Sequence, residues 1–357
     1  MAHRRRQDNS KEKEHITIVG RLEFPDIVTM AKVLYTMRLF KESIERSHIL
    51  LKKGLKDKEI VMRITRYMNN AHYSYSALKR AKMYRKQNKL NLRKPQLYSV
   101  GKACEKGNRN VRLISTDTVL VKVPHANGRH EWIKCKVKFG RKHIPIVSEL
   151  VNPGFSYSAG IVLNDGKFYL HVTIPLEIVV RYDSHPRISE KSKYIASFDL
   201  NSDRMNMVII NEKNGEILDI KNKHFPEITQ PGYSKDKARD IILKSLSELI
   251  DYAVHHNVRY FVFENLNNIK RGKTGNKNAN RKIARFPYRI LVKHARIMVK
   301  KRNGNFATVS PAYTSIDAIP LSRKLGLDVH TTAAYILAFR YLSLHKSIMY
   351  MKNKTAT

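Results

Sequence analysis

The spacing of apolar and polar positions changes along the chain and divides it into three stretches. After a charged start, the segment 15–24, HITIVGRLEF, alternates like a β-strand. From about Pro25 to Asn91, apolar residues recur three and four positions apart, which predicts helices, with Gly54 ending the first. We expect one further continuous helix over residues 56–89.

From residue 110 to residue 182 the period changes to two. Short strand-like runs, with IPIVSELV among them, are separated by Asn-Gly, Asp-Gly and Pro-Gly turns, a pattern typical of a small antiparallel barrel or sandwich. We place Trp132 in the core of this barrel. If segment 15–24 supplies another strand, the helical segment 25–109 is an insertion into the barrel domain formed by 15–24 and 110–182.

The last stretch, 193–350, follows a basic arm (1–14) and the two earlier domains, and is joined to them by a linker, 183–192. Three strand-like runs come first, then a helix, a continuous apolar strand ending at Glu264, a basic helix near 284–303, another strand, and a helix starting near Asp328. This is the layout of the ribonuclease H-like fold, with 351–357 as a tail. The predicted class is therefore α+β multidomain.

Charge indicates the kind of partner. The 357 residues include 68 Lys and Arg against 30 Asp and Glu, a net charge of +38. Such an excess attracts a polyanion, and released counterions would drive the binding. The sequence has no lipid anchor and no plainly amphipathic membrane helix, so nucleic acid is favoured over a membrane surface.

Cysteine content and hydropathy indicate the redox environment and the cellular location that we expect for the protein. The two cysteines, Cys104 and Cys135, are not in a Cys-x-x-Cys pair, which argues against a disulfide framework and a cysteine zinc ribbon. No segment approaches the long uncharged apolar run of a membrane span, and the start lacks a secretory signal. We expect a reducing, cytoplasmic location in association with the nucleoid.

Three acids are the candidate catalytic and metal-binding residues. Asp199 interrupts an apolar strand, where an unpaired charge is costly to bury. Glu264 ends a later strand, and the carboxyl ends of strands in an open α/β sheet meet at one crevice. Asp328 starts a helix that could dock at the same edge. Carboxylates on a basic protein suit two hard cations about 4 Å apart, Mg²⁺ or Mn²⁺, and phosphodiester cleavage.

Each acid also has a structural interpretation. Asp199 could cap a turn, Glu264 could be a strand-end acid facing solvent, and Asp328 could serve only as a helix N-cap. Asp203 is an alternative turn acid and Asp317 a weaker candidate for the third position. His330 is interpreted as a surface or packing histidine rather than as a ligand.

Two basic stretches are candidates for contacting nucleic acid. Between Lys79 and Lys94 there are eight basic residues and no acid, with tyrosines interspersed; the alternative is a solvated helix face. Residues 265–316 contain no acid, and KRGKTGNKNANRK within them reads as a flexible loop or, alternatively, a solvated linker. The residues that we expect to contact nucleic acid are Lys79, Arg80, Arg85, Lys86, Arg93, Lys270, Arg271, Lys273, Arg281, Lys282, Arg285 and Arg289.

Three motifs give the sequence a family resemblance. The strings IASFDLNSDRMNMVIINEKNGEI, FVFENL and VSPAYTSIDAIPLSRKLGLDVHTTAAYILAFR resemble the RuvC-like motifs of transposon-encoded OrfB/TnpB proteins, over roughly Lys193 to Leu344. Upstream, the helical segment flanked by barrel strands is similar in order to the recognition and wedge domains of that family. The resemblance implies an RNA-guided DNA endonuclease encoded by an insertion sequence, with a guide RNA and double-stranded target DNA as partners.

The resemblance places Asp199, Glu264 and Asp328 at the three metal-binding acids. From the strand and helix positions of these acids, we expect Asp199 to bridge two ions, with Glu264 and Asp328 each completing one. Two features differ from the family pattern. Residues 315–327 are short and free of cysteine, as in a branch without the zinc ribbon, and LDVHTTAA replaces the common Arg-Asp-x-Asn-Ala-Ala. A nuclease-dead RNA-guided DNA-binding protein or repressor, and a DNA strand-transfer transposase, therefore remain alternatives.

Overall fold

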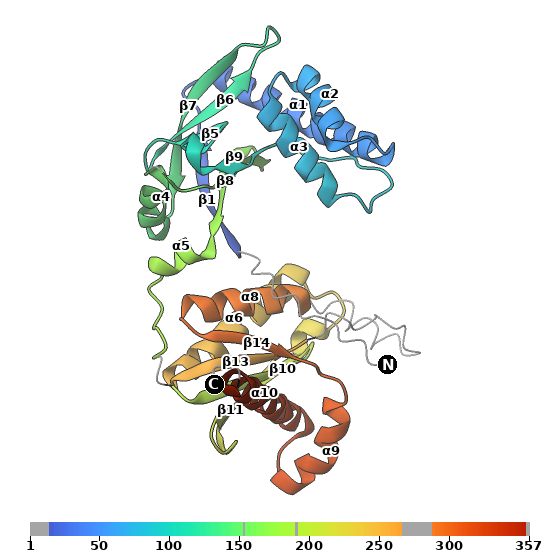
Figure 1. Ribbon diagram of the computed structural model, residues 1–357, viewed down its shortest axis with the longest axis vertical. Coiled ribbons are helices and arrows are strands. Elements are labelled where there is room, and N and C mark those ends of the chain that lie inside the picture. The colour runs from blue at the N-terminus through green and yellow to red at the C-terminus, as the bar shows by residue number, and fades with distance from the viewer. Residues whose placement is uncertain (1–13, 153, 190–191, 266–287, 355–357) are drawn as a thin grey trace. The chain divides into compact units, whose positions relative to one another are not determined.

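The computed structural model describes residues 14–152, 154–189, 192–265 and 288–354. It divides into two compact units, an N-terminal unit up to Tyr182 and a C-terminal unit from Asp183 (Figure 1). The predicted basic arm 1–14, except for Glu14, and the whole predicted loop KRGKTGNKNANRK lie outside the described residues.

The N-terminal unit is built on a curled, antiparallel, seven-stranded sheet of order β2-β8-β9-β1-β7-β6-β5 (Figure 1). The strand bounds, in that order, are Gln96–Ser99, Ser158–Asn164, Lys167–Pro175, His15–Glu23, His130–Phe139, Thr118–Pro124 and Val111–Leu113. The predicted strand at 15–24 is therefore present as β1, at the centre of the sheet. The edge strands β2 and β5 do not pair with each other among the described residues, so the hydrogen-bonded ladder is not a closed barrel.

Three helices, α1 (Ile27–Lys52), α2 (Asp57–Met68) and α3 (Ala71–Met83), follow β1. The prediction of one helix over 56–89 is wrong, because the chain breaks between α2 and α3. Asn69 adopts the left-handed conformation at φ 52°, and the Asn70 side chain accepts hydrogen bonds from the backbone N–H groups of His72 and Tyr73. Asparagine suits both positions, since it tolerates positive φ and caps helices well.

The predicted helical segment 25–109 also contains strands. Beyond α3, β2 joins the main sheet, and a two-stranded ribbon forms from β3 (Gly101–Lys102) and β4 (Gly107–Asn108) around a short helix, η1 (Ala103–Glu105). Helices α1 and α3 both contact β2, and the helices and the sheet form one compact unit.

Two further expectations for the N-terminal unit are wrong. IPIVSELV is not a strand but helix α4 (Ile144–Val151), because Pro145 favours a helix start and the buried Ile146, Val147 and Leu150 lie on one helical face. Trp132 is only half-buried, since it alternates with the buried positions of β7. Its ring instead stacks with cations, at 4.6 Å from Arg112 Cζ and 4.7 Å from Lys122 Nζ. The remaining short helices of the unit are η2 (Arg141–His143) and α5 (Leu176–Arg181).

The C-terminal unit has a five-stranded sheet of order β12-β11-β10-β13-β14. Strands β10, β11 and β12 form an antiparallel meander, and β13 and β14 run parallel to β10. The bounds are β10 Tyr194–Leu200, β11 Arg204–Asn211, β12 Ile217–His224, β13 Val258–Glu264 and β14 Asn305–Val309. All five strands lie where the hydrophobic pattern predicts them.

Helices cover both faces of this sheet (Figure 1). One face, with Phe198 and Phe263, packs against α6 (Lys235–His255) and α8 (Tyr288–Lys301). The opposite face, with Ile195 and Val262, packs against α10 (Val329–Lys354). The short η3 (Pro226–Thr229) precedes α6, and α9 (Thr314–Leu325), which sequence patterns missed because Pro320 lies inside it, precedes α10. Successive residues of β10 therefore point alternately to two different helical layers.

The predicted linker 183–192 packs on the C-terminal unit. Ile188 is buried in the core of the α6–α8 face, and its backbone N–H donates to the carbonyl of Arg302 at 2.9 Å. Asp183 forms an ion pair with Lys301 at 2.9 Å. Arg302 is itself buried and paired with Asp251.

Gly20, at the centre of β1, is a point where the sheet has no room for a side chain. A Cβ atom there would lie 2.6 Å from Val137 Cγ2 and 2.8 Å from the Phe139 ring. We expect Gly20→Ala to lower the free energy of unfolding by roughly 1–3 kcal/mol, the usual cost of overpacking. The matched control is Gly140→Ala, where the backbone is extended and a Cβ would meet only His143 Nδ1 at 4.0 Å. Equal urea midpoints for the two variants would contradict the prediction.

Candidate active site

Asp199 and Glu264 occupy matching positions at the ends of two neighbouring parallel strands. Phe198 of β10 pairs with Phe263 of β13, and each acid is the next residue along its strand. Because side chains alternate, both acids point to the face covered by α10, as Val262 and Ile195 do. Each is only 8% exposed. Parallel pairing of β10 and β13 therefore places the two buried carboxyl groups at the same edge of the sheet, where we expected the strand ends to meet.

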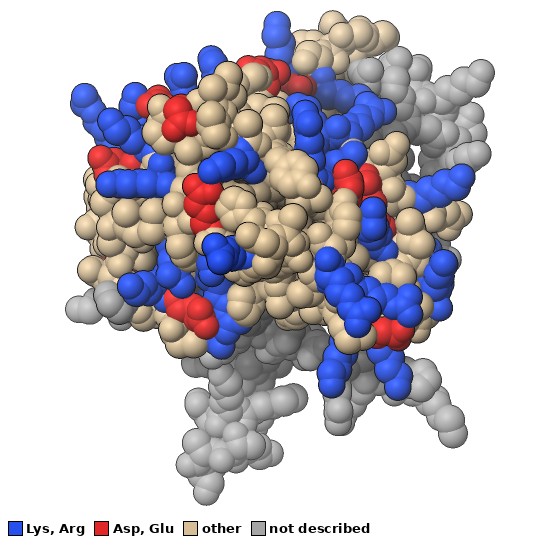
Figure 2. Space-filling model, turned by 90° about the horizontal axis from the view of Figure 1, so that it is seen from above, with Lys and Arg blue, Asp and Glu red and all other residues tan. Residues whose placement is uncertain are grey.

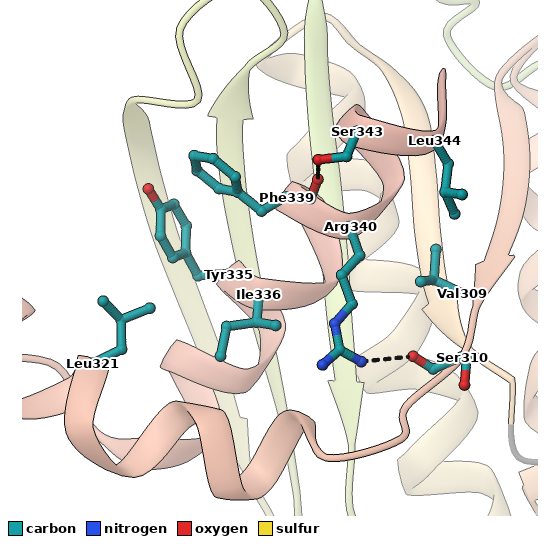
Figure 3. Close-up of a pocket in the computed structure, with 9 residues that line it drawn as sticks. All are labelled: Val309, Ser310, Leu321, Tyr335, Ile336, Phe339, Arg340, Ser343 and Leu344. Carbon is teal, nitrogen blue, oxygen red and sulfur yellow. Dashed lines mark hydrogen bonds between the residues drawn. The ribbon is translucent and has the colours of Figure 1, made fainter. Parts of the chain in front are cut away.

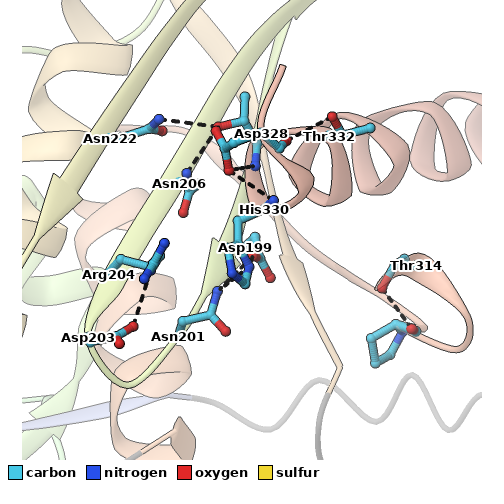
Figure 4. A network of polar contacts seen from close by, with 12 residues as sticks. Asp199, Asn201, Asp203, Arg204, Asn206, Asn222, Thr314, Asp328, His330 and Thr332 are labelled. Carbon is cyan, nitrogen blue, oxygen red and sulfur yellow. Dashed lines mark hydrogen bonds and ion pairs between the residues drawn. The ribbon is translucent and has the colours of Figure 1, made fainter. Parts of the chain in front are cut away.

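The Asp199 carboxylate is surrounded by hydrogen-bonding groups (Figure 4). Its Oδ2 accepts from Asn201 Nδ2 at 2.7 Å and lies 3.2 Å from His330 Nδ1. Its carboxyl group also shares a hydrogen bond with the carboxyl group of Glu264. The main chain of Glu264 is held separately, since the Tyr288 hydroxyl donates to its backbone carbonyl. Both acids are thus fixed by α8, α10 and the sheet.

Burial and contact separate the pKa values of the two acids. Burial, and then the hydrogen bond and charge of Asp199, raise the pKa of Glu264 to about 10. Burial alone would raise the pKa of Asp199 as well, but hydrogen bonds from His330, Glu264 and Asn201 lower it below its usual value. The hydrogen bond to Asp199 raises the pKa of His330. At neutral pH the pair therefore holds one proton, on Glu264, and Asp199 carries the negative charge.

Asp328 lies at the first turn of α10, two residues before His330, which contacts Asp199. Its Oδ1 accepts from the backbone N–H groups of His330 and Thr331 at 3.0 Å each, so it caps the helix. The residue is exposed, unlike the other two acids. His330, two positions later, makes the contact with Asp199, which the sequence did not predict. The only hint in the sequence was its position in the turn that also carries Asp328.

The donor set of this region fits a hard cation in part. Two buried carboxyl groups in contact hold a proton that a divalent ion could replace, and oxygen ligands suit Mg²⁺ or Mn²⁺. Among the described residues, however, no three His, Cys, Asp or Glu side chains form a group that could hold a metal ion. The structure brings Asp199 and Glu264 together, whereas the Asp328 oxygens are occupied by the first turn of α10.

The other candidate acids have different partners. Asp203, in the turn between β10 and β11, accepts a hydrogen bond from Arg204 Nε at 3.2 Å. Asp317, in the first turn of α9, is paired with Arg340 at 2.8 Å. The unpredicted neighbours of the acids are polar and lie close in sequence or in register: Asn201 follows Asp199 by two residues, and Asn206 faces Asp199 across the β10–β11 pair.

A basic groove of about 590 Å³ lies in the N-terminal unit between α3 and strands β1, β2, β8 and β9. The Arg80 guanidinium stacks on the Tyr98 ring at 4.3 Å, and Arg80 Nε is buried without a hydrogen-bond acceptor among the described residues. Burial, and then the charge of Arg80, lower the pKa of His171 in this groove. The groove is lined by Thr17, Lys79, Arg80, Lys82, Met83, Gln96, Leu97, Tyr98, Gly160, Val162, His171 and Thr173.

The other basic residues that we expected to contact nucleic acid are either exposed or lie outside the part of the chain that the structure describes. Arg85, Lys86 and Arg93 are exposed in the segment after α3. Figure 2 shows Lys and Arg spread over the face seen from above, with smaller patches of Asp and Glu interspersed among them. Of the tyrosines near this stretch, Tyr73 is buried, whereas Tyr75 is 53% exposed. The predicted contacts outside the described residues are Lys270, Arg271, Lys273, Arg281, Lys282, Arg285 and the side chain of Arg289.

A second hollow, of about 730 Å³, lies in the C-terminal unit around α10 (Figure 3). It is lined by Val309, Ser310, Leu321, Tyr335, Ile336, Phe339, Arg340, Ser343 and Leu344. Its charged group is already engaged, since the Arg340 guanidinium donates to the Ser310 and Ala312 carbonyls and to Asp317. None of the described residues that line the hollow is Asp or Glu, so it does not compete with Asp199 and Glu264 as the catalytic site.

In the part of the chain that the structure describes, no helix combines the length and apolarity needed to cross a bilayer.

The chain is similar in sequence to several proteins. A family model described as "SSO2105 N-terminal domain" matches residues 15–184, close to the boundary between the two units. Protein SSO2105 of Saccharolobus solfataricus is 30% identical over 353 residues, which cover 94% of each chain. A protein of Aeropyrum pernix is 24% identical over 263 residues, 67% of this chain and 69% of its own.

Solved structures give weaker likenesses. A CRISPR-Cas12f ternary complex is 10% identical with a TM-score of 0.37, covering 87% of this chain and 81% of that one. Thermus thermophilus RuvC in complex with a Holliday junction substrate is 9% identical with a TM-score of 0.29, covering 41% and 90%. Scores of this size do not establish a common fold.

The proton on Glu264 predicts a pH-dependent stability. A glutamate ordinarily has a pKa of 4.5 and that of Glu264 is about 10, so between these values the folded state binds more protons and the free energy of unfolding falls as pH rises. Asp199, with its lowered pKa, is ionised in both states above about pH 5 and adds no slope there. In EDTA, we expect Glu264→Gln to gain stability relative to wild type from about pH 5 to about pH 8, by at most about 1.4 kcal/mol per pH unit.

The matched control is Glu248→Gln on α6, whose side chain is 60% exposed and pairs with Lys223. Its stability relative to wild type should not change systematically with pH. The measurement is thermal melting at a series of pH values. A difference between Glu264→Gln and wild type that stays constant across the series would contradict a proton held on Glu264.

Proposed function

The chain belongs to the family of the Saccharolobus solfataricus protein SSO2105, and we propose that it is a metal-dependent DNA endonuclease of the TnpB kind, guided by RNA. Its C-terminal unit would be a ribonuclease H-like, RuvC-type domain. Its N-terminal unit would combine the wedge and recognition functions. Mg²⁺ or Mn²⁺ would be the cofactor, and a guide RNA and double-stranded target DNA the partners.

One observation carries this proposal: the contact between the buried carboxyl groups of Asp199 and Glu264 at the carboxyl ends of adjacent parallel strands. A site at this place suits chemistry, because strand ends at one sheet edge form the crevice where ligands bind. The sheet order β12-β11-β10-β13-β14, with its first three strands antiparallel, supports the ribonuclease H-like assignment.

Each side chain has a distinct part in the proposed reaction. Asp199 and Glu264 would hold the divalent cation, which would activate water and stabilise the leaving oxygen. Glu264 would release its proton when the cation binds, because a carboxyl ligand must be ionised. Asn201 and His330 would orient Asp199 through its Oδ2. Asp328, on the first turn of α10, is the proposed third acid.

The positive charge supports nucleic-acid binding by the N-terminal unit. In the basic groove, Arg80 offers a planar cation stacked on Tyr98, while Lys79 and Lys82 line the same wall. Such groups contact phosphates and stack with bases of single strands. Sequencing the RNA that copurifies with the protein would test guidance directly, and the absence of any specific RNA would contradict it.

A second candidate is an RNA-guided DNA-binding protein that does not cut. The absence, among the described residues, of a group of three His, Cys, Asp or Glu side chains that could hold a metal ion favours it. Mg²⁺-dependent cutting of a matched target would exclude this candidate. A strand-transfer transposase would instead join transposon ends in a purified reaction.

Asp199→Ala should abolish cleavage, by on the order of a thousandfold or more, because it removes the ionised member of the acid pair. RNA binding should remain close to wild type, since the basic groove is in the other unit. The matched control is Asp203→Ala, an acid of the following turn that pairs with Arg204. The measurement is single-turnover cutting of matched DNA in Mg²⁺. Cutting that persists in Asp199→Ala would overturn the assignment.

Arg80→Gln should weaken the binding of a mixed-sequence, single-stranded RNA. Loss of one phosphate contact should reduce the slope of log affinity against log salt by about 1. The control is Arg63→Gln on α2, whose side chain is 54% exposed and pairs with Glu59. Fluorescence anisotropy at several salt concentrations measures both variants. Equal slopes for Arg80→Gln and wild type would exclude Arg80 from the interface.

A further inference from the structure

A row of polar side chains crosses the C-terminal sheet beneath the first turn of α10. Asp199 pairs in register with Asn206 of β11, and Asn206 with Asn222 of β12, while Glu264 lies beside Asp199 on β13. These four residues form the polar row. The neighbouring positions on the same face, such as Val208 and Ile210, are apolar and pack against α10.

We propose that Thr331, supported by Asn206 and Asn222, is a positioning residue that orients the Asp328 carboxylate toward the metal site. This inference rests on the proposed function, because it assigns Asp328 to that site. It concerns Thr331, which lies in the segment LDVHTTAA, where this chain departs from the common motif in sequence and spacing.

The hydrogen bonds at Thr331 have one consistent direction; Figure 4 shows Asn206, Asn222 and Asp328, which are its partners. Its Oγ1 accepts from Asn206 Nδ2 at 3.0 Å and from Asn222 Nδ2 at 3.2 Å. A threonine hydroxyl has two acceptor sites and one proton, so with both acceptor sites filled it can only donate. The recipient is Asp328 Oδ2. The two amides thereby determine where the hydroxyl proton points, and the hydroxyl determines where the carboxylate points.

This arrangement exceeds what a helix cap requires. Capping uses Asp328 Oδ1, which accepts from the two backbone N–H groups of the first turn. The other carboxylate oxygen, Asp328 Oδ2, accepts its hydrogen bond from Thr331 Oγ1. Because Asp328 is exposed, loss of that bond would leave its outer oxygen free to turn into solvent.

The polar row is also a poor choice for stability alone. Asn206 is 1% exposed, and the Oδ1 atoms of Asn206 and Asn222 are buried without a hydrogen-bond partner in the described part of the chain. Each such oxygen loses its hydration without compensation, so apolar residues at these positions would fit the core better. Buried polar atoms without a hydrogen-bond partner are expected mainly at functional sites. The amide nitrogens of the same two asparagines both donate to Thr331 Oγ1, the hydroxyl that is bonded to Asp328.

The test compares Thr331→Val, which keeps the shape but removes the hydroxyl, with Thr331→Ser, which keeps the hydroxyl. The matched control is Thr332→Val, because Thr332 is also buried in the first turn but its hydroxyl donates to the Asp328 backbone carbonyl at 2.9 Å. The readouts are Mn²⁺ affinity by electron paramagnetic resonance, Mg²⁺-dependent cutting of matched DNA, and the melting temperature.

We expect Thr331→Val to lose roughly 10–100-fold in Mn²⁺ affinity or in cutting rate, the usual effect of removing a group that orients a metal ligand. Thr331→Ser should recover most of the loss, and Thr332→Val should stay within about twofold of wild type. Wild-type protein that cuts DNA, with Thr331→Val and Thr332→Val equally active, would overturn the inference and leave the proposed function standing. Wild-type protein that neither binds Mn²⁺ nor cuts would overturn the proposed function itself.

Discussion

The contact between the carboxyl groups of Asp199 and Glu264 is the interaction on which the arrangement of charges in the C-terminal unit depends. Two acids that are each 8% exposed cannot both be ionised next to each other, so the metal-free protein keeps a proton on Glu264. The groups around them compensate for the remaining charge on Asp199: the Asn201 amide, His330, and the N-terminal end of α10 with its partial positive charge. A cation would replace both the proton and part of this compensation.

Much of this arrangement could be predicted from the sequence. Strands β10, β11 and β13 of the C-terminal sheet follow from nearly continuous buried runs, because strands that are covered on both faces need no alternation. Asp199 and Glu264 stand out because each places a carboxylate at the end of such a run. Their meeting follows from parallel pairing of β10 and β13, a rule that needs only the strand directions.

What could not be predicted depends on local chemistry or on register. IPIVSELV reads as a strand by its β-branched residues, but Pro145 and burial at positions 146, 147 and 150 make it a helix. The break at Asn69 depends on a left-handed backbone that two adjacent asparagines allow. The contacts of Asn206, Asn222 and Thr331 depend on cross-strand register and on the docking of α10, neither of which any single segment encodes.

Helix α10 joins two tasks in one rigid element. Its first turn carries Asp328, His330 and Thr331, and its next turns form the core of one sheet face, where the Ser197 hydroxyl donates to the Ala334 carbonyl at 2.6 Å. A slide of this helix by one turn, about 5.4 Å, would withdraw His330 from Asp199 and Thr331 from Asn206 and Asn222 together. Damage to the buried apolar contacts of α10 would therefore displace the polar side chains of its first turn, although none of those contacts belongs to the polar row.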